Sequence, residues 1–374
     1  MTTTKNNEHK KLNVPNLRFP EFQGEWSVTT LQKDCIVNPT NEKIADKFVY
    51  VDLESVKQGQ LYKYQILTKD NAPSRAQRVL HTDDILFQCV RPYQMNNYMV
   101  KGTMSDIQWV ASTGYAQIRT QTDYPAFLYY VLNTSKYNKA VMVRCTGSSY
   151  PAINSEDLSK IPFYKCGIAE QKKIADFLSL LDERIATQNK IIDKLQSLIK
   201  GLRNQLFNND KDWRIAKIRE LLCIGNGKDY KHLGIGDIPV YGTGGKMLSV
   251  NDYLYDGDSV CIGRKGTIDT PLFLTGKFWT VDTLFYTYGF KDILPKFCYY
   301  LFKQINWQLY NEGTGVPSLS KSTVENIKVR IPSIIQQHKI CYILDCYEDK
   351  IKSEGLILDL YCSQKQYLLR QMFV

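Results

Sequence analysis

The sequence predicts an α+β protein in which two mixed α/β domains alternate with two long helices, and in which the helices pair as an antiparallel coiled coil within the chain. Three observations lead to this prediction. The chain repeats itself at an offset of 166 residues, each copy of the repeat ends in a heptad pattern, and the other segments mix strand-like and helix-like runs. A single repeat of this length indicates a pseudo-twofold tandem duplication and not a solenoid.

The repeat is clearest where residues 147–207 match residues 313–373 without a gap. Within it, IAEQKKIADFLSLLDERI (168–185) lies over IIQQHKICYILDCYEDKI (334–351). The identities are Gly147, Pro151, Ile161, Ile168, Gln171, Lys173, Ile174, Leu178, Ile185, Ile191, Asp193, Gln205 and Phe207, which recur as Gly313, Pro317, Ile327, Ile334, Gln337, Lys339, Ile340, Leu344, Ile351, Ile357, Asp359, Gln371 and Phe373.

Upstream the match is weaker. Trp26 and Trp213 open the two halves, and DILF (84–87) resembles DSVC (258–261), followed by Arg91 and Arg264 respectively. We therefore expect four segments. A first domain covers 1–167, a first helix 168–207, a second domain 208–333 and a second helix 334–374.

Both helices are predicted from apolar residues that alternate at spacings of four and three, as the a/d seam of a coiled coil requires. The first seam reads Ile174, Leu178, Leu181, Ile185, Gln188, Ile192, Leu195, Ile199, Leu202 and Leu206. The second reads Ile340, Leu344, Tyr347, Ile351, Glu354, Leu358, Tyr361, Lys365, Leu368 and Met372. A seam this long needs a partner, and the simplest partner is the other copy, packed antiparallel. The alternative is that each helix is buried separately in its own domain.

Two further features of the helices have open interpretations. Gln188 and Glu354 hold the same seam position near each helix midpoint, so they either fix the antiparallel register or are tolerated in a hydrated centre. Apolar residues such as Phe177 and Ile343 lie off the seam and leave room for a second helical partner.

The two globular segments contain strand-like runs at 48–53, 84–90 and 283–288 and helix-like runs at 125–133 and 295–304. Their loops combine arginine, amide, tyrosine and glycine residues. Arg pairs with guanine and Asn or Gln with adenine through two hydrogen bonds, while glycine-rich backbone with lysine suits phosphate. These loops therefore favour nucleic acid, although a polar surface loop is the simpler interpretation of each one alone. The candidates are Arg75, Arg78, Arg91, Tyr93, Gln94, Asn96, Asn97 and Tyr98 in the first domain, and Tyr241, Thr243, Gly244, Lys246, Arg264 and Lys265 in the second.

Composition is consistent with that interpretation and excludes several others. The chain has 48 basic and 38 acidic residues, a net charge of +10, which is compatible with a nucleic-acid partner. No apolar run reaches the length of a membrane span, the N-terminus is too polar for a signal peptide, and the ten cysteines contain no CxxC pair. We expect a cytoplasmic protein with free thiols and no metal site.

The sequence contains no catalytic motif in a context that would support catalysis. There is no GxGxxG after a strand and no Walker loop, because Met247 follows Gly245 and Lys246. Asp345 with Glu348, Asp349 and Lys350 superficially resembles a nuclease motif, but these residues lie on the heptad helix, where a solvated face with i,i+4 pairs is expected. The chain is predicted to be a recognition or scaffold subunit, not an enzyme.

The sequence, with its duplicated order of domain and helix, resembles a known family, the specificity subunits of type I restriction-modification enzymes. The resemblance lies in VPNLRFPEFQGEW (14–26), the 74–92 stretch from SRAQ to DDILFQCVRP, IPVYGTGG (238–245), and the helix starts AEQKKIA (169–175) and IQQHKIC (335–341). It covers nearly the whole chain.

The resemblance implies that each globular segment is a target-recognition domain for one half of a bipartite site in double-stranded DNA. It also implies that the helices form a spacer that docks two methyltransferase subunits, which carry S-adenosylmethionine and methylate adenine. Motor and nuclease subunits that use ATP and Mg join for restriction. The chain itself would hold no cofactor and perform no catalysis.

Two alternatives stay open from the residues alone. One is a coiled-coil adaptor with two protein-binding domains that does not bind DNA. The other is the specificity subunit of a system in which one partner combines nuclease and methylase. Steep salt dependence of DNA binding would separate the adaptor from a DNA reader.

Overall fold

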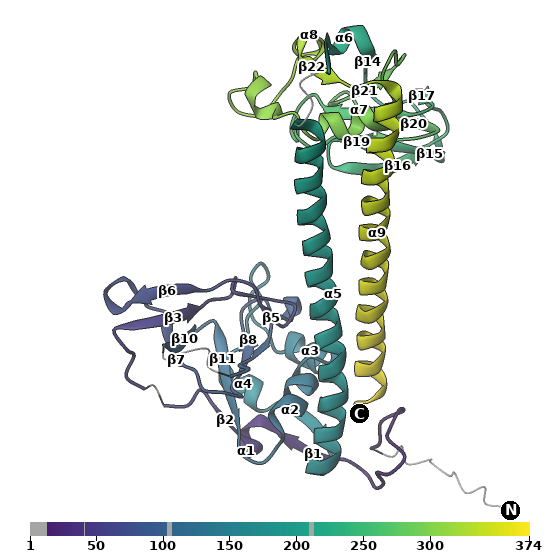
Figure 1. The fold of residues 1–374 in the computed structure, drawn as a ribbon. Helices are drawn as coiled ribbons and strands as arrows, with labels where there is room; N and C mark the ends of the chain where they lie inside the picture. Colours follow the sequence, from purple (N-terminus) through teal and green to yellow (C-terminus); the bar gives the residue numbers. More distant parts are fainter. Residues whose placement is uncertain (1–12, 41, 103–106, 209–212) are drawn as a thin grey trace, which may run out of the picture. The chain divides into compact units, whose positions relative to one another are not determined.

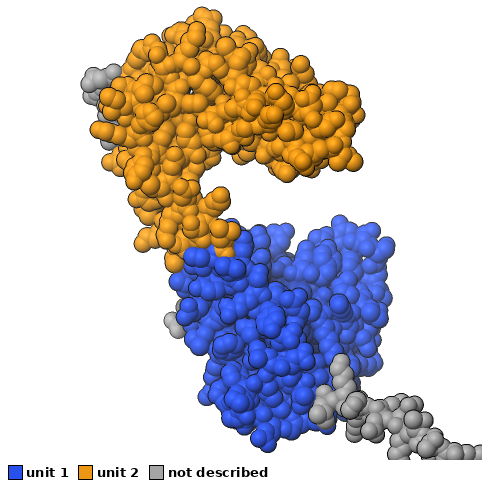
Figure 2. All heavy atoms as spheres, turned by 90° about the vertical axis from the view of Figure 1, so that its right-hand side faces the viewer, with its two compact units in different colours: residues 1–188, 357–374 blue, residues 189–356 orange. Residues whose placement is uncertain are grey.

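Two long helices run through the chain at the positions that the heptad pattern predicts. In the computed structural model, α5 spans Ile168–Asn208 and α9 spans Ile334–Gln371 (Figure 1). The structure describes residues 13–40, 42–102, 107–208 and 213–374. The chain divides into two compact units, coloured in Figure 2: unit 1 contains residues 1–188 and 357–374, and unit 2 contains residues 189–356. Each unit therefore includes one part of both helices.

Unit 1 contains short strands and short helices in addition to its parts of α5 and α9. Its strands are β1 (Ser27–Thr30), β2 (Cys35–Val37), β3 (Lys47–Val51), β4 (Val56–Lys57), β5 (Gln60–Leu61), β6 (Gln65–Thr68), β7 (Ala76–Val79), β8 (Ile85–Gln88), β9 (Tyr98–Met99), β10 (Gln108–Ser112), β11 (Tyr115–Thr120) and β12 (Pro162–Lys165). Its helices are α1 (Leu31–Asp34), η1 (Lys69–Asn71), η2 (Pro92–Gln94), α2 (Pro125–Leu132), α3 (Ser135–Val143) and α4 (Ser155–Ser159).

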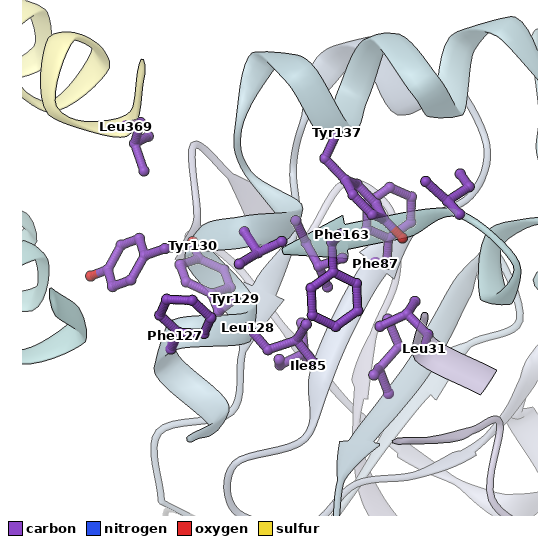
Figure 3. Close-up of a cluster of buried hydrophobic side chains, with 14 of the residues drawn as sticks. Leu31, Ile85, Phe87, Phe127, Leu128, Tyr129, Tyr130, Tyr137, Phe163 and Leu369 are labelled. Carbon is purple, nitrogen blue, oxygen red and sulfur yellow. The ribbon is translucent and has the colours of Figure 1, made fainter. Parts of the chain in front are cut away.

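The largest core of unit 1 joins a sheet of order β2-β11-β8-β9 to the helices. Phe127 and Leu128 of α2, Ile85 and Phe87 of β8 and Leu369 of α9 belong to one cluster of buried side chains (Figure 3). Leu369 is only 4% exposed, and burying a leucine side chain stabilises a fold by about 2 kcal/mol. The end of α9 is thus part of the core of unit 1.

Unit 2 is built from the same kinds of element. Its strands are β13 (Arg214–Lys217), β14 (Cys223–Asn226), β15 (Ile235–Gly242), β16 (Gly245–Val250), β17 (Tyr255–Asp256), β18 (Ser259–Gly263), β19 (Leu272–Leu274), β20 (Lys277–Thr280), β21 (Leu284–Tyr288) and β22 (Lys328–Ile331). Its helices are α6 (Ile218–Leu221), α7 (Pro295–Phe302), η3 (Trp307–Tyr310) and α8 (Lys321–Asn326).

The sheet topologies confirm the tandem duplication. Unit 1 has the orders β6-β3-β10-β7 and β2-β11-β8-β9, and unit 2 has β16-β15-β20-β17 and β14-β21-β18-β19. In each unit the first of these sheets has one parallel pair at its centre, β3 with β10 or β15 with β20. A two-stranded antiparallel ribbon, β1 with β12 or β13 with β22, precedes each long helix. The strand-like and helix-like runs predicted from the sequence match β3, β8, β21, α2 and α7 to within two residues at every end.

A buried glutamine attaches the start of each long helix to its domain. Gln171 on α5 accepts a hydrogen bond from the Tyr124 amide (2.8 Å) and donates to the Cys166 carbonyl (2.9 Å). Gln337 on α9 accepts from the Leu294 amide (2.8 Å) and donates to the Pro332 carbonyl (3.0 Å). The two residues recur in the repeat because each accepts a hydrogen bond from the backbone N–H just before α2 or α7. The N–H groups at a helix start have no partner within the helix.

Within each unit the two long helices pack against each other. In unit 1, Lys365 pairs with Asp182 (2.5 Å), while Tyr361 and Gln188 line the same groove, so residue numbers fall along α9 as they rise along α5. This is the antiparallel pairing that the seam predicts. Of the predicted seam, the following residues are buried or half-buried: Ile174, Leu178, Leu181, Ile185, Gln188, Ile192, Leu195, Ile199, Leu202, Ile340, Leu344, Ile351, Glu354, Leu358 and Leu368.

The prediction of a solvated face with i,i+4 pairs holds at Asp349 and Lys350, which are exposed, and Lys350 pairs with Glu354 one turn on (2.6 Å). It is wrong for Asp345 and Glu348, which are half-buried. Asp345 accepts a hydrogen bond from Tyr300 (2.5 Å), and Glu348 pairs with Lys303 (2.9 Å). Both carboxylates therefore anchor α9 to α7, because the domain packs against this part of the helix. In the part of the chain that the structure describes, no helix combines the length and the apolar character needed to cross a lipid bilayer.

Candidate nucleic-acid interface

In unit 1 the loop that follows β8 is held by the buried amide of Gln88. Its Nε2 atom donates to the Val90 carbonyl and to Gln94 Oε1, each at 2.8 Å, and its Oε1 atom accepts from the Asn96 amide at 3.1 Å. The Gln88 backbone amide in turn donates to Asn97 Oδ1 at 2.8 Å. The loop is therefore shaped by its own amide side chains.

The structure separates the predicted residues of this loop into an outer and an inner set. Tyr93 is 52% exposed and Gln94 is also exposed, so both reach the surface. Asn97 is 1% exposed and donates to Asn133 Oδ1 at 3.2 Å, and Tyr98 is half-buried, with the pKa of its phenol raised by burial. Asn97 and Tyr98 support the loop from within, while Asn96 is half-buried and accepts from the Gln58 amide (3.1 Å).

Three arginines of unit 1 lie on segments that backbone hydrogen bonds join. The Thr113 amide donates to the Arg75 carbonyl (2.9 Å), and the neighbouring Gly114 carbonyl accepts from Cys89 (3.0 Å), two residues before Arg91. Arg75 is exposed in a loop. Arg78, predicted as a loop residue, lies instead in β7.

The guanidinium of Arg78 is half-buried. Burial lowers its pKa, and its Nε atom has no hydrogen-bond partner among the described residues.

The sequence prediction missed Tyr150. The Arg91 guanidinium carbon lies 4.4 Å from the centre of the Tyr150 ring, and the Arg91 amide donates to the Pro151 carbonyl at 2.8 Å. The signal was present in the repeat, because Gly147 and Pro151, on either side of Tyr150, recur as Gly313 and Pro317. This recurrence marks a second loop, 145–152, that joins the loop after β8.

In unit 2 the two predicted loops are also brought together. A Cβ atom added to Gly266 would lie 3.6 Å from Thr243 Oγ1, which places the loop after β18 beside the β15–β16 turn. Gly244, Lys246, Arg264 and Lys265 are exposed around this point. The YGTGG segment is a strand with a tight turn, not an open loop, so only Thr243 and Gly244 lie outside β15 and β16. Tyr241 is half-buried in a core cluster of the unit.

Matched hydrogen bonds correct the correspondence between the units. In unit 1 the Cys89 amide donates to the Gly114 carbonyl, and the Cys89 carbonyl accepts from the Ile153 amide. In unit 2 the Arg264 amide donates to the Thr283 carbonyl, and the Arg264 carbonyl accepts from the Leu319 amide. Two residues after Cys89, the Arg91 amide donates to the Pro151 carbonyl. Two residues after Arg264, the Gly266 amide donates to the Pro317 carbonyl. Arg91 is therefore equivalent to Gly266 and not, as the sequence comparison predicts, to Arg264. A short sequence match could not detect this shift of two residues.

Unit 1 thus presents guanidinium groups and amide side chains on joined loops, and unit 2 presents guanidinium and ammonium groups with exposed backbone. Cations and backbone N–H groups suit phosphates, and amides and guanidinium groups suit base edges. Among the described residues, no group of three or more His, Cys, Asp or Glu side chains is placed to hold a metal ion.

The fold and these loops define a class of protein: a duplicated recognition module carried on a pair of long helices. The family model for the type I restriction modification DNA specificity domain matches residues 35–197 and 210–359. The chain belongs to this family and carries two copies of its recognition domain.

Relatives with known names agree with the family. A Haemophilus influenzae protein named as a type I restriction enzyme specificity subunit is 29% identical over 44% of this chain and 48% of its own length. The MjaVIII specificity subunit of Methanocaldococcus jannaschii is 22% identical over 59% of this chain and 62% of its own length. The chain thus spans about half to three-fifths of the length of these relatives.

Among solved structures, the S subunit of a type I system from M. genitalium has a similar fold. Its TM-score is 0.63 at 19% identity, covering 96% of this chain and 99% of that one. A chain from the type I R-M system solved for its assembly and conformational transition gives a TM-score of 0.58 at 18% identity, covering 92% and 96%. At these identities the likeness establishes the fold.

Proposed function

We propose that this chain reads a bipartite site in double-stranded DNA for a type I restriction-modification complex, with one half-site for each recognition domain. The observation that supports this most is the loop cluster that recurs in both units on the same backbone hydrogen bonds. Two equivalent readers in one chain suit a target with two separate halves. Lysine and arginine at the cluster would contact phosphates, and the loop amides and guanidinium groups would contact bases.

The long helices are proposed to scaffold the catalytic subunits. Apolar residues off the seam remain exposed, including Phe177 (41%) and Leu180 (60%) in unit 1 and Ile343 (37%) in unit 2. Exposed apolar side chains on a helix are suited to a helical partner. We assign these faces to two methyltransferase subunits, with motor and nuclease subunits joining when the complex restricts DNA.

The proposed division of labour leaves this chain without catalysis. S-adenosylmethionine would bind the methyltransferase subunits, and ATP and Mg would bind the motor subunits. Asp345 and Glu348 belong to the sequence pattern that superficially resembles a nuclease motif. Both side chains attach α9 to its domain, which supports a structural role for them.

The test is a methylome. The chain is co-expressed with the methyltransferase subunit of its own system in a host that lacks DNA methylation, and modified adenines are mapped by sequencing. We expect a split motif with a fixed gap whose bases are not read. Exchanging residues 208–333 for those of a second family member should change one half of the motif only. No modified adenine from a complex that assembles on gel filtration would contradict DNA reading and favour the adaptor.

A further inference from the structure

We propose that Arg91 and Tyr150 form a stacking platform for an unpaired base in the half-site that unit 1 binds. The inference rests on the proposed function and adds a named role for two side chains. Neither side chain is explained by the packing of unit 1.

The first observation is the backbone of Arg91. Its φ is +54°, in the left-handed region that glycine enters easily and other residues rarely do. The equivalent residue of unit 2 is Gly266, with a φ of +96° and the same hydrogen bond to a loop proline carbonyl. The fold thus favours glycine at this position. Strained backbone of this kind clusters at functional sites, so an arginine at this position points to a function of its side chain.

The second observation is the position of Tyr150. Tyr150 is 63% exposed although the Arg91 guanidinium carbon lies 4.4 Å from the centre of its ring. A guanidinium plane covers one face of a ring, which leaves the other face open to a planar ligand. Exposed tyrosine rings stack on nucleic-acid bases of any sequence, and an arginine behind the ring adds cation–π attraction.

The third observation is that the Tyr150 loop is held in place. Thr146 and Ala152 exchange two backbone hydrogen bonds of 2.9 Å across its base. Gly147 turns the chain with a φ of +87°, and a Cβ atom there would lie 3.1 Å from the Tyr150 carbonyl oxygen. The ring is therefore presented on a fixed loop, which lowers the entropy lost on binding.

An unpaired base is the ligand that fits. Inside a duplex both faces of a base are covered by its neighbours. Methylation of adenine requires that the adenine leave the stack, which leaves its partner base in the opposite strand unpaired and free to leave its own stack. A ring backed by a guanidinium can cover that orphaned base. Unit 2 has Gly266 and Val316 at the equivalent positions, so the platform is a property of unit 1.

The experiment compares the affinity of the complete complex for two duplexes. One carries the target site identified from the methylome, and the other has an abasic site in place of the base opposite the target adenine in the half-site of unit 1. The complex is the full chain with its methyltransferase subunit, carrying the wild-type chain, Tyr150→Ala, Tyr150→Phe or Tyr253→Ala. Tyr253 is the matched control, a 44% exposed tyrosine of unit 2 whose ring lies 4.7 Å from Lys277 Nζ.

We expect the wild-type complex to prefer the intact duplex, because only this duplex offers the orphaned base to the Tyr150 ring. Tyr150→Ala should reduce this preference about tenfold, the order of one aromatic–base stack, while Tyr150→Phe and Tyr253→Ala keep it. An unchanged preference in Tyr150→Ala would overturn the platform. Equal weakening on both duplexes would overturn it too, since Tyr150 would then be an ordinary duplex contact. A wild-type complex that binds no split site would contradict the proposed function itself.

Discussion

Replacing Gln337 with leucine should weaken the attachment of α9 to the domain of unit 2. Gln337 is 0% exposed, and its amide accepts from the Leu294 amide (2.8 Å) and donates to the Asp292 and Pro332 carbonyls (2.9 and 3.0 Å). Gln337→Leu leaves one N–H and two C=O groups without these partners. An unsatisfied buried group costs about 1–3 kcal/mol, and Asp292 is exposed enough for its carbonyl to be hydrated. Two groups remain, so we expect a loss of about 3 kcal/mol.

The loss is measured by urea unfolding of the full chain, with hydrogen exchange of the Leu294 amide as a local readout. Gln205→Leu is the control, because Gln205 is an exposed glutamine on α5 in the same unit and should change stability by less than about 0.5 kcal/mol. The Leu294 amide should lose protection only in Gln337→Leu. If Gln337→Leu unfolds at the same urea concentration as Gln205→Leu, the reasoning about these hydrogen bonds is refuted.

Three further predictions concern the helices and their ends. Inserting one heptad into both long helices should lengthen the gap in the methylated motif by about three base pairs, since seven residues add roughly 10.5 Å, and an unchanged gap would contradict the helices as a ruler. Gln188→Leu combined with Glu354→Leu should raise the melting temperature and give a mixed gap in the methylome, because the polar positions no longer fix the register; higher stability with an unchanged gap would count against that role. Arg18→Ala should cost about 3–5 kcal/mol in urea unfolding, because it leaves Glu170 buried without its two-point ion pair of 2.7 and 2.8 Å, whereas Lys160→Ala, which breaks an exposed pair, should cost less than about 1 kcal/mol.

Periodicity explains what the sequence could predict. The a/d spacing of residues such as Ile174 and Leu178 depends only on helix geometry, so the long helices and their pairing follow from it. The helices α2 and α7 could also be predicted, because each is an apolar run that begins with a proline at the first helical position. The recurrence of Gln171 as Gln337 was visible too, although its reason needed the backbone atoms that each amide binds.

The candidate interface was harder to predict because side-chain direction is set by tertiary contacts. Asn97 and Gln94 are both amides of one loop, yet Asn97 is buried and Gln94 is exposed. Nothing in their local sequence distinguishes them. Tyr150 lies 59 positions after Arg91, and backbone hydrogen bonds to the carbonyls of Pro151 and Cys89 bring the two segments together. The roles in DNA binding of the predicted residues stay predictions until the methylome is read.

The way the two units share the chain has a consequence for biosynthesis. Unit 2 is one continuous stretch, residues 189–356, whereas unit 1 begins the chain and also needs residues 357–374. Leu368, Leu369 and Met372 from that last stretch are buried in the core of unit 1. A ribosome therefore releases everything that unit 2 requires before it releases the last part of unit 1. The domain that is translated first is the one that finishes folding last, and a nascent chain that stalls before α9 is complete would expose the apolar core of unit 1 to chaperones and proteases.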